Sequence, residues 1–336
     1  MCEAAADSRA LRLQVIEEIR HVVGFDAYAW LLTDPETSVG TAPLADVPWL
    51  PELPRQIRLK YLTAVNRWTT LGASVSSLHQ ATGADLSQSL ICRDLLSRYD
   101  VSDVASAVFR DRFGCWGFLD LWRSGRQQFN DAETAYLTGL VGSLTMALRR
   151  CQASPFISEP AQKPRRVGPV VLLLSPELEV LGQTPEAPSY LRLLVPPEGG
   201  QPPVPASAYN VAAQLCANEA GVDGNRPSAR VHLSDGLWLT LRAARIGGDG
   251  SPGERDIAVT IEAASTSERV DLFVRAFGLS PRESELLGHL AAGADTRELA
   301  RRMFLSENTV QDHLKSIFAK TSAHNRRTLL SRALGS

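Results

Sequence analysis

The feature that most constrains the fold is a pair of short helices joined by a very short turn near the C-terminal end of the sequence. One helix is predicted to begin at Asp295 or Thr296, and the next is capped by Ser306, directly after Phe304 and Leu305. Apolar residues at helical spacing predict the buried side of this second helix: Val310, Leu314, Ile317 and Phe318. So short a turn between two helices is typical of a helix-turn-helix motif, whose second helix enters the major groove of DNA.

A preceding helix carries start signals that agree with one another. Ser280 is its predicted cap, Pro281 suits the first helical position, Glu283 completes a capping box, and Gly293 follows as a stop. The run LSPRESELLGHLAAGADTRELARRMFLSENTVQDHLKSIFAK resembles the LuxR/NarL-type DNA-binding domain through the elements L-[ST]-x-R-E, A-x-G, E-[IL]-A, L-S-x-x-T-V and H-x-x-x-I-x-x-K. The resemblance implies a four-helix domain whose third helix reads DNA and whose fourth, expected at residues 326–334, helps dimers to form.

The resemblance also implies roles for the polar residues of the third helix. Thr309 matches a phosphate contact near the start of this helix, and Lys320 matches one near its end. Asp312 and Lys315 match positions that point into the major groove, and Gln311 stands where the family usually has a basic residue. Because a Gln amide pairs well with the major-groove edge of adenine, Gln311 is expected to shift base preference toward adenine. The candidate DNA-binding residues are Asn308, Thr309, Gln311, Asp312, Lys315 and Lys320.

Two neighbouring features are interpreted differently. His313 is expected to pack and form hydrogen bonds inside the domain rather than to contact a base. The segment Thr321-Ser322-Ala323 departs from the Leu-Gly-Val-like turn that is common in the family, so the turn before the fourth helix is not predicted. Without the surrounding motif, the polar residues of the third helix would be interpreted as an ordinary solvated face.

The distribution of charge favours an anionic partner for the C-terminal end alone. Residues 271–336 hold ten Lys and Arg against seven Asp and Glu, whereas the remainder of the chain holds 25 against 30. From His313 to the end of the sequence, five residues are basic and none is acidic. A locally basic end on an acidic body fits a protein that contacts nucleic acid with that end.

The length of 336 residues predicts a multidomain protein. Residues 1–150 are expected to form an α+β domain that resembles a GAF domain, in the order of its elements and in GFLDLWR followed by QQFNDAETAYLTGLVGSLTMAL. The proline-containing residues 151–168 look like a linker. Residues 169–265 have the order ββ, αα, βββ, which predicts a five-stranded antiparallel sheet and an α+β domain that resembles a PAS domain. Residues 266–336 are expected to form the all-α four-helix helix-turn-helix domain.

The first 150 residues contain recognisable helix and strand patterns. Helices are predicted at 8–23, 51–70, 86–98 and 131–149, and strands at 25–32, 103–110 and 115–123. Asn130 and Glu133 form the predicted capping box of the last helix. Two placements of the apolar stripe of that helix stay open: it pairs across a dimer with residues 8–23, or it lies on its own sheet.

Aromatic residues suggest a candidate ligand pocket in the first domain. Strand alternation places Tyr28 and Trp30 on one face of a strand, and Trp116 and Phe118 on one face of another. These four residues either line a small-molecule site or form the core of the domain. No spacing of Cys and His residues supports a metal site, so neither a metal nor another cofactor is expected.

The sequence also excludes several classes of protein. It contains no P-loop, no G-x-S-x-G, no H-E-x-x-H and no dinucleotide-binding fingerprint, so no enzyme activity is expected. It shows neither a signal peptide at MCEAAADSRA nor an apolar run of membrane-spanning length, so a cytoplasmic protein without a membrane partner is expected.

The expected function is that of a transcriptional regulator. Its expected partners are double-stranded DNA, a small-molecule effector, a second copy in a homodimer, and RNA polymerase. Two alternatives remain: a signalling adaptor that binds a protein through its sensor domains, and a sigma-factor-like subunit. The second lacks a recognisable promoter-melting region.

Overall fold

The computed structural model describes residues 7–125, 127–157, 168, 170–194, 205–233, 237–247 and 252–335. Its contacts divide the chain into two compact units. The first unit is Met1–Leu148 with Arg165–Ala263, and the second is Arg149–Pro164 with Ala264–Ser336. The first unit therefore contains both regions that were predicted as sensor domains, and the boundaries expected between those regions stay predictions.

The first unit begins with a five-stranded antiparallel sheet in the order β2-β1-β5-β4-β3. Its strands are β1 (Ala27–Thr33), β2 (Gly40–Asp46), β3 (Val75–Ser77), β4 (Val101–Asp111) and β5 (Gly114–Ser124). The strands β1, β4 and β5 lie where the sequence predicts them, whereas β2 and β3 were not predicted. Both missed strands are edge strands. The edge position explains how β2 tolerates Pro43, which has no N–H for a ladder hydrogen bond.

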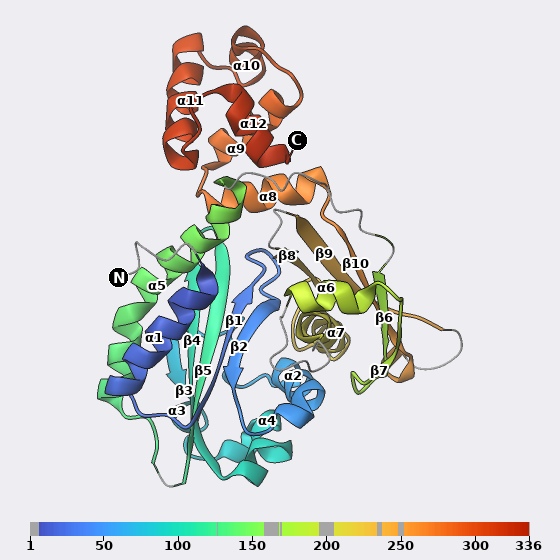
Figure 1. Ribbon diagram of the computed structural model, residues 1–336. Helices are drawn as coiled ribbons and strands as arrows, with labels where there is room; N and C mark the ends of the chain where they lie inside the picture. Colours follow the sequence, from blue (N-terminus) through green and yellow to red (C-terminus); the bar gives the residue numbers. More distant parts are fainter. Residues whose placement is uncertain are drawn as a thin grey trace. The chain divides into compact units, whose positions relative to one another are not determined.

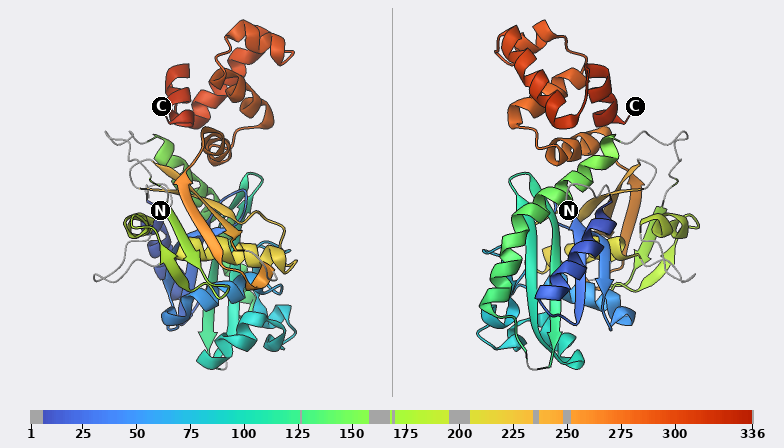
Figure 2. Two further views of the ribbon diagram at one scale, coloured as in Figure 1. Left: turned by 90° about the vertical axis from the view of Figure 1, so that its right-hand side faces the viewer. Right: turned by 60° about the vertical axis from the view of Figure 1, so that its left-hand side comes forward.

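Two helices lie side by side over one face of this sheet, α1 (Ser8–Val22) and α5 (Asp131–Ile157) (Figures 1 and 2). The predicted capping box of α5 is present, since Asn130 and Glu133 exchange hydrogen bonds of 2.9 and 3.0 Å. The apolar stripe of α5 is buried within the chain itself: Leu137, Val141, Leu144 and Leu148. The sequence left open whether this stripe pairs across a dimer or packs on the sheet of its own chain. In the structure it packs on that sheet.

The chain between β2 and β4 forms three short helices besides β3: α2 (Leu53–Leu62), α3 (Leu78–Ala81) and α4 (Leu90–Asp94). It also contains 3-10 turns at Leu50–Glu52, Leu86–Gln88 and Leu96–Tyr99. The predicted helix 51–70 is thus shorter than expected. It ends at Thr63, which has an extended backbone, and Asn66 has a positive φ of 54°. The next residue, Arg67, is 2% exposed and hydrogen-bonds to groups of several other segments, so tertiary contacts override the helical pattern here.

The second sheet is also antiparallel and five-stranded, as predicted, in the order β7-β6-β10-β9-β8. Its strands are β6 (Val170–Leu174), β7 (Val180–Gln183), β8 (Ser228–His232), β9 (Trp238–Arg245) and β10 (Ile257–Ala263). Two helices accompany it, α6 (Ala187–Leu194) and α7 (Ala206–Glu219), with a short 3-10 turn at Pro252–Glu254. Their positions agree with the predicted order of elements.

Helix α7 packs against both sheets (Figure 1). Eleven of its fourteen residues are buried, and it contacts α2 and β2 on one side and β9 and β10 on the other. One hydrophobic cluster runs from residues such as Ala29 and Phe118, through Val211, to Leu239 and Val259. The two sheets therefore share one core, which the separate reading of each segment in the sequence did not anticipate.

A buried ion pair also joins the two sheet regions. Arg230 in β8 donates to Asp34, just after β1, through its backbone N–H (2.8 Å), its Nε (2.7 Å) and its Nη2 (2.8 Å). The Asp34 side chain is 1% exposed and that of Arg230 is 5% exposed. Burial of Asp34 disfavours its ionised form, but the hydrogen bonds and the charge of Arg230 outweigh burial and lower the pKa of this carboxyl.

The second unit is all-helical in its described part. It holds the last turns of α5 from residue 149, with α8 (Thr266–Ala276), α9 (Pro281–Ala291), α10 (Thr296–Arg302), α11 (Glu307–Thr321) and α12 (Arg326–Leu334). Phe156 is 2% exposed and meets Phe273 of α8 at a ring distance of 5.3 Å. The start of the predicted linker 151–168 is therefore helical and partly buried despite Pro155, while residues 158–167 lie outside the described residues.

The buried pair gives a first testable prediction. Asp34→Asn should lower the free energy of unfolding of the first unit by about 3–5 kcal/mol, because it leaves the Arg230 charge buried without its carboxylate. Chemical denaturation followed by tryptophan fluorescence measures this, since all six tryptophans lie in the first unit. Glu36→Gln is the matched control: Glu36 pairs with the same arginine at 3.2 Å but is 39% exposed, so its loss should cost about 1 kcal/mol or less. Equal losses from both variants would contradict the prediction.

Candidate nucleic-acid interface

Helices α10 and α11 form the tight pair that the sequence predicts. They pack against each other and are joined by residues 303–306 alone. Val310, Leu314 and Ile317 are each at most 2% exposed and hold α11 against the rest of the domain. Phe318, predicted on the same side, is half-buried, and Thr321 takes the last buried position instead.

The starts of α9, α10 and α11 are fixed by the caps that the sequence predicts. Ser280 and Glu283 form the capping box of α9, and the Asp295 side chain accepts from the backbone N–H of Glu298 at the start of α10. At α11, Ser306 Oγ accepts from the backbone N–H of Thr309 at 3.1 Å. The expected fourth helix, 326–334, is found as α12 with those bounds.

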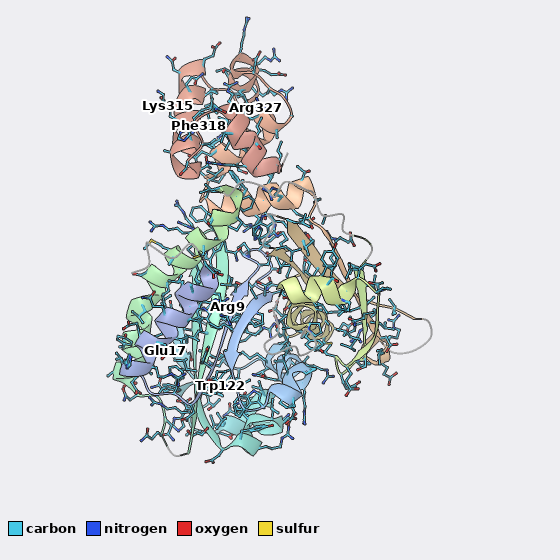
Figure 3. The ribbon with its side chains drawn as sticks, in the orientation of Figure 1. Arg9, Glu17, Trp122, Lys315, Phe318 and Arg327 are labelled. Carbon is cyan, nitrogen blue, oxygen red and sulfur yellow. The ribbon has the colours of Figure 1, made fainter. Side chains whose placement is uncertain are left out.

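The polar residues predicted to read DNA form one exposed stripe along α11. Asn308, Gln311, Asp312 and Lys315 are all exposed and lie three or four residues apart along the helix, so they share one face. The structure therefore brings these four candidates together. Figure 3 shows Lys315 and Phe318 on this helix and Arg327 on α12.

Within this stripe, the existing partners of the side chains are weak. Lys315 Nζ lies 3.1 Å from Asp312 Oδ1, but the two side chains are 77% and 73% exposed, so water competes with the pair. Gln311 Nε2 reaches Thr296 Oγ1 only at 3.5 Å. His313 is half-buried, consistent with its expected place inside the domain rather than on the reading face.

Two predicted phosphate contacts already have partners inside the domain. The hydroxyls of Thr309 and Ser306 lie 2.8 Å apart. Lys320 Nζ donates to Glu283 Oε2 at 2.6 Å, which ties the end of α11 to the start of α9. Lys320 is thus a structural cation in this domain, and its contact with phosphate stays a prediction.

Glu283 is the centre of a hydrogen-bond network that sequence reasoning missed. Its carboxylate is 3% exposed and accepts from Lys320, from Ser316 Oγ at 2.7 Å and from the backbone N–H of Ser280 at 2.6 Å. Burial opposes its ionisation, but these donors outweigh burial and lower the pKa of Glu283 to about 2. Its capping role was visible in the sequence, whereas its partners on α11 are over 30 positions away and left no local signal.

The four aromatic residues predicted as a candidate pocket are all buried, between 0% and 6% exposed. Trp30 stacks on Phe109 at 5.2 Å, and Phe118 stacks on Trp68 at 4.5 Å. Tyr28 meets Phe25 edge-on, and Trp116 donates to Asp111. The β4–β5 ladder shifts register where Trp116 lies, so the regular alternation expected between Trp116 and Phe118 is interrupted.

A small cavity of the first unit lies elsewhere on this sheet. It measures 20 Å³, room for about one water molecule. Its polar lining includes Lys60, Asn66, Ser106 and Asp120, and Lys60 Nζ pairs with Asp120 Oδ2 at 2.6 Å. The candidate aromatics Tyr28, Trp30, Trp116 and Phe118 do not line this cavity. The structure therefore does not place the four candidate aromatic residues around this cavity.

Two features concern the described residues alone. Among them, no helix combines the length and apolar character that crossing a membrane requires. Nor do three or more His, Cys, Asp or Glu side chains of the described segments gather at a possible metal site.

Comparison with known proteins identifies the C-terminal domain. Residues 278–333 match the family model of bacterial regulatory proteins, luxR family. Over 53 residues the chain is 46% identical to the probable csgAB operon transcriptional regulatory protein of Salmonella typhimurium, covering 16% of this chain and 24% of that protein. Over 54 residues it is 43% identical to the monoamine regulon transcriptional regulator of Klebsiella aerogenes, with the same coverage of each chain. Residues 278–333 thus form a LuxR-type helix-turn-helix domain.

The similarity is confined to part of each protein. This chain spans about a quarter of the length of the curated relatives it matches. The crystal structure of Escherichia coli SdiA aligns with 99% of this chain and 93% of that chain, at 12% identity and a TM-score of 0.35. That likeness is too low to support a conclusion about the first unit, and its GAF-like and PAS-like character remains a prediction.

The Glu283 network gives the second testable prediction. Because the pKa of Glu283 is about 2 in the folded domain and about 4.3 in an unfolded chain, its ionisation stabilises the domain by about 2–3 kcal/mol at pH 7. This contribution is complete above about pH 5 and is lost as the pH falls toward 2. Glu283→Gln should therefore speed hydrogen exchange in α9 and α11 at pH 7, and its difference from the wild type should narrow below about pH 4.5.

Glu268→Gln provides the control for this measurement. Glu268 forms the same kind of capping box with Ser265 at the start of α8, but in an exposed position. Its replacement should cost about 1 kcal/mol or less. A Glu283→Gln domain that exchanges no faster than Glu268→Gln would rule out the stabilising role of the network.

Proposed function

We propose that this protein is a sequence-specific DNA-binding transcriptional regulator. The observation that carries the proposal is the exposed polar stripe on α11 within a LuxR-type helix-turn-helix domain. In helix-turn-helix proteins the second helix of the motif enters the major groove and its first turns contact base edges. Here α11 takes that position, and its inner side is fully used for packing, so the stripe is available for a partner.

The residues of the stripe take different roles in this proposal. Lys315 is suited to guanine and Gln311 to adenine, because their donors match acceptors in the major groove. The N-terminus of α11 faces a phosphate, since its free N–H groups and helix dipole favour an anion, and Thr309 and Asn308 lie in its first turn. Lys320 positions α11 through Glu283 rather than binding phosphate as its main role.

The first unit is proposed to sense a signal and to form part of a homodimer. A small-molecule effector would act by binding one arrangement of the protein better than another, because only such a difference shifts a population. The site of such an effector is not located, because the four candidate aromatic residues pack into the core and the cavity beside Lys60 and Asp120 has room for about one water molecule. RNA polymerase is the proposed protein partner at a promoter.

Selection of DNA by the full-length protein tests the proposal directly. The protein is incubated with random genomic fragments at several salt concentrations, and the retained DNA is sequenced. A regulator should enrich a short, roughly palindromic site with an affinity that falls as salt rises. If no sequence is enriched while a protein partner binds fully, the signalling-adaptor alternative replaces this proposal.

The third testable prediction concerns Lys315. Lys315→Ala should weaken binding to the selected site about fivefold or more and relax base preference at one position, because a good base contact contributes about 1–3 kcal/mol. Binding is measured by fluorescence anisotropy on the selected site and on variants of it.

Arg282→Ala is the matched control for Lys315→Ala. Arg282 is 60% exposed and pairs with Glu285 at 2.8 Å at the same i,i+3 spacing, but it lies on α9. Each substitution removes one exposed cation from a weak ion pair, so both should leave folding unchanged within about 0.5 kcal/mol. Equal losses of DNA affinity would show that net charge, and not the position of Lys315, is responsible.

A further inference from the structure

The turn between α10 and α11 has an unusual residue at its centre. The backbone N–H of Leu305 donates to Ala300 O at 2.9 Å, and that of Phe304 donates to Arg301 O at 3.4 Å. These two bonds are those of a Schellman motif, which ends a helix through one residue in the left-handed conformation. That residue is Phe304, with φ of 55°. Glycine is usual at this position because a Cβ makes the left-handed conformation unfavourable.

Other helices of the same unit show the usual solution. Helix α8 is followed by Gly278 with φ of 62° and α9 by Gly293 with φ of 88°, and both have the same pair of closing hydrogen bonds. Helix α12 closes on Gly335 with φ of 79°. Glycine thus serves three of these turns, whereas α11 ends on Ser322 with φ of 52°, and phenylalanine at Phe304 costs backbone free energy that glycine would avoid.

Burial does not compensate for this cost. Phe304 is 94% exposed, whereas the other exposed large hydrophobic residues of the described segments range from 37% to 56%. Leu305, next in the chain, is half-buried at the position where an apolar residue usually accompanies such a turn. A large ring that neither fits the backbone nor packs inside the domain is explained by a contact with a partner.

The surroundings of Phe304 identify the kind of partner. It lies two residues before Ser306, the cap of α11, and two or three residues after Arg301 and Arg302, which are 77% and 43% exposed. Both arginines share the single carboxylate of Glu298, at 3.7 and 2.5 Å, so positive charge is in excess beside the ring. An apolar ring with surplus cations next to the proposed reading helix fits the edge of a DNA groove, where apolar groups lie beside phosphates.

We propose that Phe304 is a DNA contact, whose ring packs on a thymine methyl group or a deoxyribose at the edge of the groove that α11 enters. Arg301 binds the adjacent phosphate. The phenylalanine is retained at a glycine position because this contact raises affinity for DNA. The inference rests on the proposed function and adds an apolar contact to the polar stripe of α11.

Two variants of the full-length protein separate the ring from the backbone. Phe304→Gly removes both the ring and the unfavourable conformation, whereas Ser322→Gly relieves the same conformation (φ of 52°) at the end of α11 without removing a ring. Both should melt at the wild-type temperature or above it, as followed by circular dichroism. Phe304→Gly should bind the selected site at least about threefold more weakly, with an unchanged salt dependence because no charge is lost. Ser322→Gly should bind as the wild type does.

The result that would overturn the proposal is a folded Phe304→Gly protein that binds the selected site as tightly as the wild type. Loss of transcriptional regulation with unchanged DNA affinity also overturns it and assigns the ring to a protein partner. A marked drop in melting temperature overturns it by showing that the ring stabilises the fold. If the wild type itself binds no DNA, the proposed function fails as well, so the two failures are distinguishable.

Sites with deoxyuridine in place of thymine assign the contact to the methyl group if affinity falls and to the sugar if it does not.

Discussion

The carboxylate of Glu283 is the interaction on which the geometry of the C-terminal domain depends. It caps α9 and binds Ser316 and Lys320 on α11, so one buried charge fixes the angle between two helices that are far apart in sequence. A buried carboxylate is unfavourable unless several donors surround it, and here three donors do. Because α11 carries the proposed reading stripe, this network sets the position from which each side chain of the stripe reaches outward.

The parts of the fold that sequence reasoning predicted are those fixed by local chemistry. The caps Ser280, Asp295 and Ser306 satisfy backbone groups within one turn, so the starts of α9, α10 and α11 were readable from residue type alone. The periodic apolar stripe of α11 was readable for the same reason. The exposed stripe is the opposite face of the same helix. It could be predicted once the family motif identified this helix as the third of the domain.

What sequence reasoning missed depends on contacts between distant segments. The edge strand β2 contains Pro43 and lacks clear alternation, and its identity comes from pairing with β1. Lys320 looked like a free cation because its partner Glu283 lies 37 positions earlier. The four aromatic residues could not be assigned to pocket or core by alternation, because stacking with Trp68 and Phe109 depends on the folded sheet.

In the first unit, burial of charge couples the two sheets. Asp34 with Arg230 and Arg67 with Asp223 are pairs whose side chains are at most 5% exposed, and each joins a residue of the first sheet region to one of the second. Separating the sheets would expose α7 and break both buried ion pairs. On the proposed function, an effector would therefore act on the two regions as one body rather than as independent modules.

The exposed acid in the reading stripe has a consequence for how the protein would search a genome. Asp312 places a negative charge where every DNA sequence presents phosphates, so it weakens contact with all sites alike. At a matching site a base amino group, such as that of cytosine, can donate a hydrogen bond to this carboxylate and release Lys315 for its own contact. Random DNA offers no such compensation. On the proposed function, Asp312 therefore shortens the residence time of the protein on unrelated DNA and raises the ratio of specific to non-specific binding. In a genome this ratio matters more than affinity alone.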